Sequence, residues 1–175
     1  MVASLFARLN GRENSKSEVA ARSTAPRRRR LAGVVGALIT VSVLSGVMTS
    51  CETTAADRAA VVNAINHSRA QAGLRGLREH PDLNAKASAW ASHMRDRCAI
   101  SHSRLADGAP AGWRKLGENV GRGGSIGAVH NAYMNSPGHR ANVLDSSFNY
   151  VGAGAVWGTC NGRRTVFTVH VFMKA

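Results

Sequence analysis

Three short pieces of the sequence carry side chains that could do chemistry: "SHS" with His102, "GEN" with Glu118 and "SPGHRAN" with His139. Each lies at the boundary of a helix or strand pattern, and functional groups concentrate at such boundaries. Two imidazoles and a carboxylate suit zinc or another divalent cation as ligands. The intervals of 16 and 21 residues between them are not diagnostic of a metal motif. The alternative is therefore three separate polar residues, each hydrogen-bonded to nearby backbone.

A second pattern could supply a nucleophile. "GGSIG" at 123–127 fits the G-x-S-x-G elbow of hydrolases, and Asp145 and His170 follow in the order of a hydrolase triad. That elbow needs a buried strand before the serine and a larger sheet than about 120 residues supply. Ser125 is sufficiently explained as the N-cap of the helix that follows it. The sequence therefore disfavours a serine hydrolase.

Three stretches have the apolar spacing of helices that would position these groups. The first is 57–73, which ends at a glycine, and the second is 81–98. The second has an apolar stripe that we expect to face the core, made of Leu83, Ala87, Trp90, Met94 and Cys98. The third covers 125–135, and the corner at Ser136-Pro137-Gly138 breaks it before "HRANVL" forms one more helical turn.

The C-terminal part is strand-like. "YVGAGAVWGT" and "RTVFTVHVFM" flank "CNGR", in which Asn161-Gly162 is the strongest short hairpin signal. Between residues 99 and 124, Gly and Pro interrupt the pattern and leave only a short strand or turn at 116–121. Helices followed by an antiparallel hairpin indicate an α+β fold with helices layered on a small, mostly antiparallel sheet.

The N-terminal part has a different character. Residues 1–26 are polar and aperiodic, which is typical of disorder. A basic block, Arg27–Arg30, precedes an uncharged apolar run at 31–48, whose length as a helix is close to the hydrocarbon thickness of a membrane. A basic block before an apolar run directs export of the chain beyond it, so we expect 52–175 outside the cytoplasm. The run ends in "MTSC", which resembles a bacterial lipoprotein signal with Cys51 as the lipidated residue. An uncleaved membrane anchor and an ordinary signal peptide remain alternatives.

Charge and cysteine content narrow the function further. Lys and Arg number 23 against 10 Asp and Glu, a formal net charge of +13. The basic residues are scattered without a nucleic-acid recognition module, so the charge favours anionic cell-envelope components or lipid headgroups over nucleic acid. Three cysteines in an exported chain leave one without a partner. If Cys51 is lipidated, Cys98 and Cys160 remain to form a disulfide in an oxidising compartment.

The motifs occur in an order that resembles the CAP superfamily: "HS", "GENV", a helix ending "YMNSPGHRANVL", and a hairpin ending "VHVFM". This superfamily groups cysteine-rich secretory proteins, antigen 5 and plant pathogenesis-related proteins, and it has many bacterial members. The resemblance covers about residues 57–175, and the ordered set is far more specific than "GEN" alone. It implies an α-β-α sandwich, and the pair of cysteines and the extracellular address agree with it.

The resemblance also implies a site. In this family a central cleft is lined by two histidines and two acidic residues that can hold a divalent cation such as zinc. His102, Glu118 and His139 match three of these four, and the corner would aim His139 at the other two. The second acid falls near Ser136 here, which weakens the expectation of a cation. His170 stands where relatives often carry Gln, and it either lines the same cleft or is a hydrogen-bonded core residue.

For this family, binding is a broader expectation than catalysis. We therefore expect a non-enzymatic module for lipids, anionic cell-envelope components or extracellular proteins, attached to a membrane through its N-terminal segment. Ser136 and Asn119, like His170, are candidates to line the cleft. Asn119 and Asn142 are expected to satisfy backbone groups around the corner rather than to do chemistry. The alternative is a metal-dependent protease or other hydrolase in which Glu118 acts as general base with a polarised water or with His102. No activated nucleophile is evident in the sequence.

Overall fold

The computed structural model describes the backbone of residues 3–7 and the whole of residues 53–175. The helices are α1 (Ala55–Gln71), α2 (Pro81–Asp96), α3 (Ile126–Met134) and α4 (Pro137–Val143). The strands are β1 (Ala3–Ala7), β2 (Arg78–Glu79), β3 (Lys115–Gly123), β4 (Tyr150–Cys160) and β5 (Arg163–Lys174). The predictions for the apolar run 31–48 and for Cys51 lie outside the described residues. None of the helices just named is both long and apolar enough to cross a membrane.

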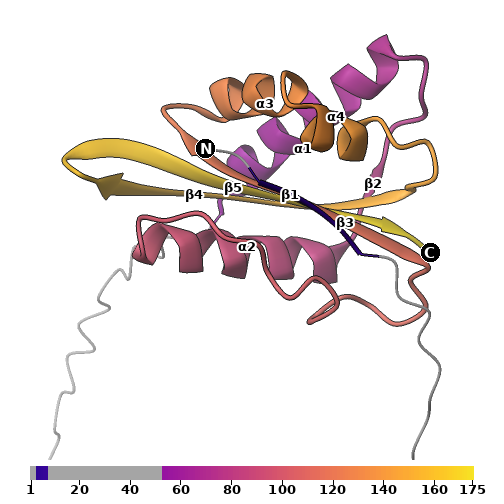
Figure 1. The fold of residues 1–175 in the computed structure, drawn as a ribbon, viewed down its shortest axis with the longest axis horizontal. Helices are drawn as coiled ribbons and strands as arrows, with labels where there is room; N and C mark the ends of the chain where they lie inside the picture. The colour runs from indigo at the N-terminus through magenta and orange to yellow at the C-terminus, as the bar shows by residue number, and fades with distance from the viewer. Residues whose placement is uncertain (1–2, 8–52) are drawn as a thin grey trace, which may run out of the picture. The chain divides into compact units, whose positions relative to one another are not determined.

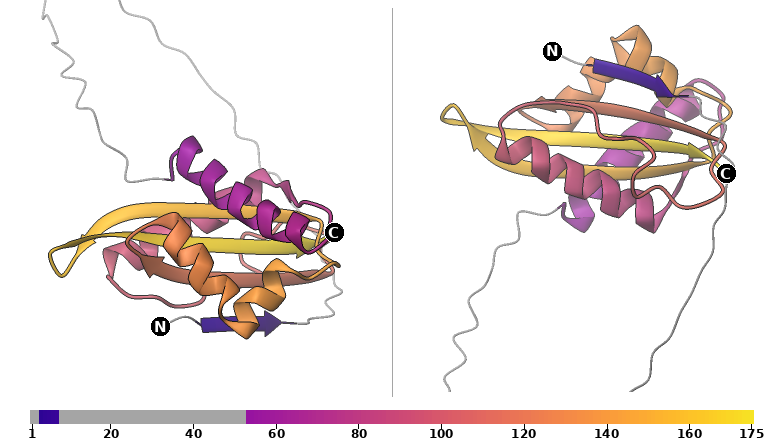
Figure 2. Two further views of the ribbon diagram at one scale, coloured as in Figure 1. Left: turned by 90° about the horizontal axis from the view of Figure 1, so that it is seen from above. Right: turned by 60° about the horizontal axis from the view of Figure 1, so that its bottom comes forward.

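The strands form one sheet in the order β1-β3-β5-β4-β2. Only β2 and β4 pair in parallel, and the other neighbours are antiparallel. Helices α1, α3 and α4 cover one face of the sheet and α2 covers the other (Figure 1), as two further views confirm (Figure 2). The predicted α+β class and the α-β-α layering are therefore confirmed.

The predicted helices agree with the structure because their caps were readable in the sequence. Ser125 caps α3 by accepting a hydrogen bond from the backbone N–H of Ala128 at 3.1 Å. Pro137 begins α4 at the first helical position, where a proline sacrifices no helical hydrogen bond. The hairpin is also as predicted, since Asn161 and Gly162 both have positive φ, at 52° and 73°, as a two-residue hairpin turn requires.

Strand β3 is longer than the short strand or turn predicted at 116–121. Its nine residues pair one for one with β5, from Lys115↔Lys174 to Gly123↔Val166. Glycines at 117, 121 and 123 hid the strand pattern, because they carry no side chain to alternate. The structure explains two of them, since a Cβ on Gly121 would lie 2.8 Å from the Tyr133 hydroxyl and one on Gly123 2.8 Å from Val129.

Residues 3–7 correct the expectation that 1–26 lacks regular structure. They form β1, which pairs antiparallel with β3 in the register Ala3↔Val120 to Ala7↔Leu116. The composition of the segment could not reveal this, because the pairing uses backbone groups at the open edge of β3.

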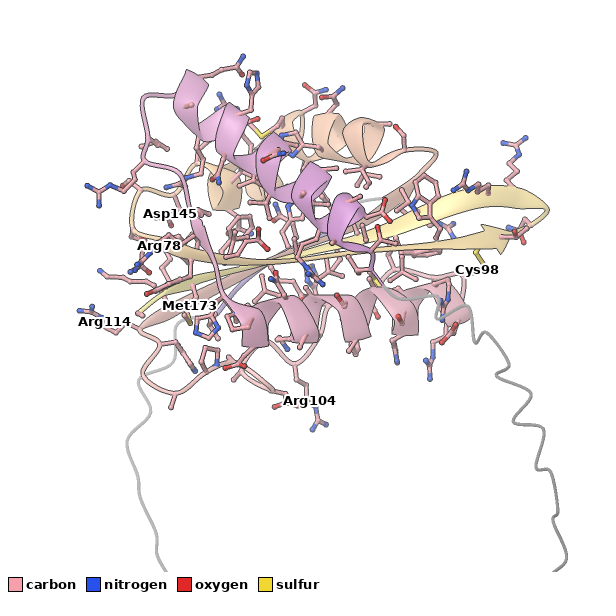
Figure 3. All side chains as sticks on the ribbon, turned by 180° about the vertical axis from the view of Figure 1, so that it is seen from behind. Arg78, Cys98, Arg104, Arg114, Asp145 and Met173 are labelled. Carbon is pink, nitrogen blue, oxygen red and sulfur yellow. A yellow bond between two sulfur atoms is a disulfide. The ribbon has the colours of Figure 1, made fainter. Side chains whose placement is uncertain are left out.

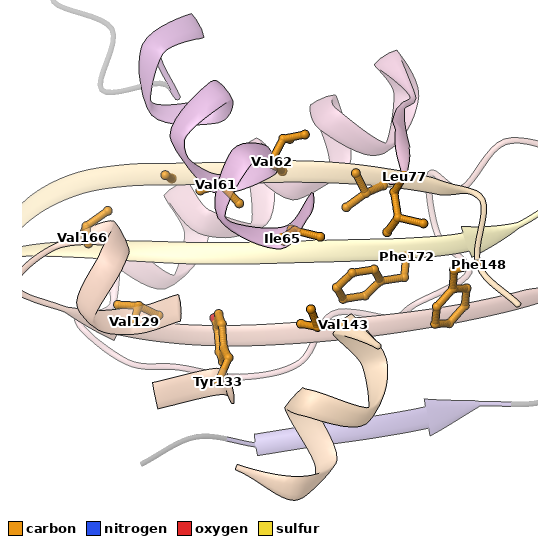
Figure 4. Close-up of a cluster of buried hydrophobic side chains, with 13 residues drawn as sticks. Val61, Val62, Ile65, Leu77, Val129, Tyr133, Val143, Phe148, Val166 and Phe172 are labelled. Atoms are coloured by element: carbon orange, nitrogen blue, oxygen red, sulfur yellow. The ribbon is translucent and has the colours of Figure 1, made fainter. Parts of the chain in front are cut away.

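Two hydrophobic clusters hold the layers together. One lies between the sheet and helices α1, α3 and α4 (Figure 4), and the other lies between the sheet and α2. Helix α2 approaches β4 very closely, because a Cβ added at Gly152 would lie 2.1 Å from the Leu83 carbonyl carbon and one at Gly154 2.3 Å from the Ala87 oxygen. The helix therefore rests directly on strand backbone.

The predicted disulfide between Cys98 and Cys160 is present, with the two Cα atoms 5.6 Å apart. It joins the residue two positions beyond the end of α2 to the last residue of β4, across 62 residues of sequence. Closing a loop of this length limits the unfolded chain, so the bond ties α2 to the hairpin and stabilises the fold by about 2–4 kcal/mol.

Candidate functional site

The central feature of the site is the pair formed by His102 and Glu118. Leu116, Glu118 and Val120 alternate along β3, and the two apolar members pack in the cluster under α2, so Glu118 faces that layer. Its carboxylate is fully buried. Oε1 accepts hydrogen bonds from His102 Nδ1 at 2.7 Å and from the Ser103 backbone N–H at 2.9 Å. Oε2 accepts from the Ser103 hydroxyl at 2.6 Å.

These contacts define the chemistry of both partners. Three donors are directed at this one carboxylate. Because the carboxylate accepts, the hydrogen on neutral His102 lies on Nδ1, and Nε2 keeps its lone pair. Nε2 is buried and has no hydrogen-bond partner within the described residues. Glu118 therefore orients His102 and leaves one imidazole nitrogen free.

His139 lies on α4, directly after the predicted corner. Its side chain is buried, its Nδ1 lies 2.7 Å from the Ser136 hydroxyl, and its ring stacks on Tyr133 with centroids 5.1 Å apart. Ser136, at the position expected for the second acid, thus presents a hydroxyl that contacts the histidine. Asn119 donates to the His139 carbonyl at 3.1 Å, and Asn142 donates to Asn119 at 2.9 Å. Both asparagines join α4 to β3.

The structure tests how well these groups would fit a cation. Both oxygens of Glu118 are occupied by hydrogen-bond donors, and Nδ1 of His139 is occupied by Ser136. In residues 53–175, no group of three or more His, Cys, Asp or Glu side chains is placed to hold a metal ion. As arranged, His102 pairs with Glu118 and His139 contacts Ser136, and the three residues do not fit a three-ligand centre.

His170 lies on β5 on the face covered by α1, α3 and α4. Its ring meets Tyr133 edge to face, with centroids 4.8 Å apart, and Nδ1 finds no partner in the part of the chain that the structure describes. Burial, with a further contribution in the same direction from His130 and His139, lowers the pKa of His170 to about 3. His170 is therefore a neutral, buried neighbour of His139 at ordinary pH.

A groove that sequence reasoning missed lies beside the His102–Glu118 pair. It has a volume of about 630 Å³, and its lining includes Lys86, Trp90, His93, Ser103 and Arg104. Trp90 and His93 stack with centroids 4.2 Å apart and planes 12° apart. The sequence predicted Trp90 as core, but the ring is only half-buried and donates through Nε1 to the Ser101 carbonyl. Helical spacing could not distinguish the core from the margin of the apolar stripe.

The competing serine-hydrolase pattern is not assembled. The Ser125 hydroxyl caps α3 instead of facing a histidine. Asp145 bonds Lys115 and Ser147, and the hydrogen bonds on its carboxylate lower its pKa against the effect of burial. The described hydrogen bonds of the Asp145 carboxylate thus hold the loop before β4, and none of them joins it to His170.

Replacing Glu118 by glutamine tests the importance of the central carboxylate. Glu118→Gln keeps the size but removes the charge and turns one acceptor into a donor that faces existing donors. We expect the free energy of unfolding to fall by about 2–3 kcal/mol, because buried donors lose a charged acceptor. Urea unfolding followed by circular dichroism measures this. Asp107→Asn, an exposed change of the same type, should shift the free energy by less than about 0.5 kcal/mol, and equal losses would contradict the assignment.

The sequence matches a family profile and a bacterial protein. The profile of the cysteine-rich secretory protein family, CAP, matches residues 62–172. The uncharacterised protein YkwD of Bacillus subtilis is 31% identical over 105 residues, which cover 55% of this chain and 41% of that protein. The chain thus spans well under two thirds of that curated relative.

Two solved structures share the fold. An outer surface protein of Borrelia burgdorferi superposes with a TM-score of 0.54 and 19% identity, covering 66% of this chain and 90% of that one. An extracellular protein of Bacillus anthracis that contains an SCP domain gives a TM-score of 0.55 and 23% identity, covering 67% of this chain and 40% of that one. At these identities the likeness is one of fold alone.

Proposed function

This chain belongs to the cysteine-rich secretory protein (CAP) family, and we propose that it is an exported, non-enzymatic module that binds an amphipathic anion in the groove beside Glu118. The observation that carries the proposal is the groove itself. Its Trp90–His93 wall offers an apolar surface to an acyl chain, and Lys86 and Arg104 outnumber Asp107 at its margin, which leaves a net positive charge there. A lipid with an anionic headgroup has this combination of properties.

The state of the neighbouring polar residues favours binding over catalysis. A general base must reach the substrate. Glu118 is fully buried and accepts three hydrogen bonds, and the His102 Nε2 that keeps its lone pair is buried as well. The Ser103 hydroxyl donates to that carboxylate instead of to a histidine nitrogen. In this arrangement the Glu118 carboxylate fixes Ser103, which lines the groove.

An exported location is part of the same proposal. A disulfide between Cys98 and Cys160 suits an oxidising compartment. The two structural neighbours are an outer surface protein and an extracellular protein. Attachment through the run 31–48 or through a lipidated Cys51 would hold the groove near a membrane, with anionic envelope polymers or surface proteins as further partners.

Quenching of tryptophan fluorescence tests the groove. Dibromostearate, whose bromines quench only nearby indoles, should quench the full-length protein saturably, and EDTA should not change this. Trp90→Phe should remove most of the quenching, whereas Trp157→Phe, a change on β4 away from the groove, should preserve it.

Two results would contradict the proposal. Quenching that survives Trp90→Phe would place the lipid elsewhere. Peptide or ester hydrolysis that is lost in Glu118→Ala would favour the alternative of a hydrolase that uses the same residues.

A further inference from the structure

A second hollow, of about 730 Å³, lies where the loop after α1, the loop before β4 and the end of β5 meet. All of the charged side chains that line it are basic: Arg69, Arg75, Arg78, Arg114 and Lys174. Figure 3 shows Arg78 and Arg114 at the same end of the sheet, away from Cys98. The hollow shares none of its lining residues with the groove at Trp90.

The hollow differs from an ordinary patch of surface charge because one of its lining arginines, Arg69, is buried and held in place by hydrogen bonds. It is only 1% exposed. Its Nε donates to the Arg75 carbonyl at 2.9 Å, and Nη1 donates to the carbonyls of Val143 at 2.8 Å and Asp145 at 2.9 Å. Its remaining nitrogen, Nη2, has no hydrogen-bond partner among the described residues. The hollow is thus lined by a buried guanidinium that still has donors to offer.

The charge of Arg69 is not neutralised by direct contact with a carboxylate. Burial lowers its pKa, and the nearby charge of Asp145 only partly opposes this. The Asp145 carboxylate itself is engaged by Lys115 and Ser147. A buried cation that bonds only neutral carbonyls is costly unless an anion can approach it.

The arginines at the rim have acceptors of their own. Arg78 donates to the Tyr150 hydroxyl at 2.6 Å with its guanidinium over that ring, and Arg114 donates to a main-chain oxygen of Ala175, the last residue of the printed sequence, at 2.6 Å. Within residues 53–175, none of the basic residues that line the hollow forms an ion pair with an Asp or Glu. Their positive charges therefore add together around one space.

We propose that this hollow is a binding site for a ligand with clustered phosphate groups. Guanidinium groups bind phosphate oxygens through paired donors and stay charged at all physiological pH values. A space of this size accommodates more than a single phosphate. Both a phospholipid headgroup and a soluble or polymeric phosphate carry this chemistry. The inference is independent of the groove at Trp90, because it depends on different residues.

Titration of the full-length protein with inorganic tripolyphosphate tests the site at physiological salt. The hollow variant, Arg75→Gln with Arg114→Gln, removes two exposed charges at the rim and should weaken binding about tenfold or more. The matched control is Arg163→Gln with Arg164→Gln, which removes two exposed charges at the hairpin turn. It should change affinity by less than about threefold, because those charges are screened from the hollow.

Three results would overturn the proposal: no saturable binding of tripolyphosphate, an affinity that the hollow variant does not change, or equal losses of affinity in both variants. Equal losses would show that tripolyphosphate responds to the net charge of the protein and not to the hollow. Thermal unfolding confirms that both variants are folded. Competition separates the two sources of phosphate. Displacement of tripolyphosphate by dihexanoyl phosphatidylglycerol but not by the matching phosphatidylcholine would support a headgroup. Displacement by neither would support a soluble or polymeric phosphate.

Discussion

Gly154→Ala is expected to destabilise the protein by about 3 kcal/mol or more, although it adds a single methyl group. That methyl would lie 2.3 Å from the Ala87 oxygen and 2.7 Å from the Ser88 nitrogen, both of which are backbone atoms of α2. No side-chain rotation can relieve this contact, so the whole helix must move away from β4. Movement of α2 would open the cluster beneath it. Urea unfolding of the full-length protein followed by circular dichroism measures the loss.

The same substitution at another glycine provides the control. Gly127 lies in the first turn of α3, and a Cβ there would meet nothing within 4 Å. Gly127→Ala should therefore stabilise the protein by about 0.5–1 kcal/mol, because alanine loses less backbone entropy in a helix. A neutral Gly154→Ala would show that α2 does not rest on β4 as closely as the structure indicates.

His170 is expected to make the protein acid-sensitive. Burial, and then the charges of His130 and His139, lower its pKa in the folded state to about 3. In the unfolded chain it titrates near its usual value of about 6.5. As the pH falls below that value, the unfolded state binds a proton that the folded state rejects, so stability is lost. The loss from this residue should reach about 3 kcal/mol between about pH 6.5 and pH 4.

His170→Gln isolates this effect, because glutamine has a similar size and does not titrate. The free energy of unfolding of the variant, measured in urea at several pH values, should fall less steeply than that of the wild type between about pH 6.5 and pH 4. His67→Gln, a change at an exposed histidine of α1, should leave the slope unaltered. Parallel curves for the wild type and His170→Gln would contradict the expectation.

The sequence predicted most of the fold where local signals were strong. The cap at Ser125 and the pair Asn161-Gly162 each determine the backbone over a few residues, and both were correct. The break before the second helix was also correct, but α4 begins at Pro137, two residues earlier than predicted. Strand β2 was missed because two residues have no periodicity, and it pairs with β4 through contacts distant in sequence. The extent of β3 was missed because its glycines conceal alternation.

Little of the candidate site could be predicted in detail. Motif order predicted one site with His102, Glu118 and His139; the first two share a hydrogen bond, whereas His139 contacts Ser136 and the groove at Trp90 was not predicted. Nothing in the sequence could indicate that Ser103 donates two hydrogen bonds to that carboxylate. These bonds depend on how the loop that carries Ser103 folds over β3. Arg69 was equally hidden. An arginine within a helix gives no sign that its partners are carbonyls more than 70 residues away.

The position of β1 has a topological consequence for how the protein matures. Its pairing with β3 requires residues 3–7 and 115–123 to occupy the same compartment. If the run 31–48 crosses a membrane once, which is one of the alternatives that the sequence leaves open, those two segments end on opposite sides. The β1–β3 pair would then belong to the precursor before translocation, and delivery across the membrane would separate β1 from β3 and leave that strand edge unpaired.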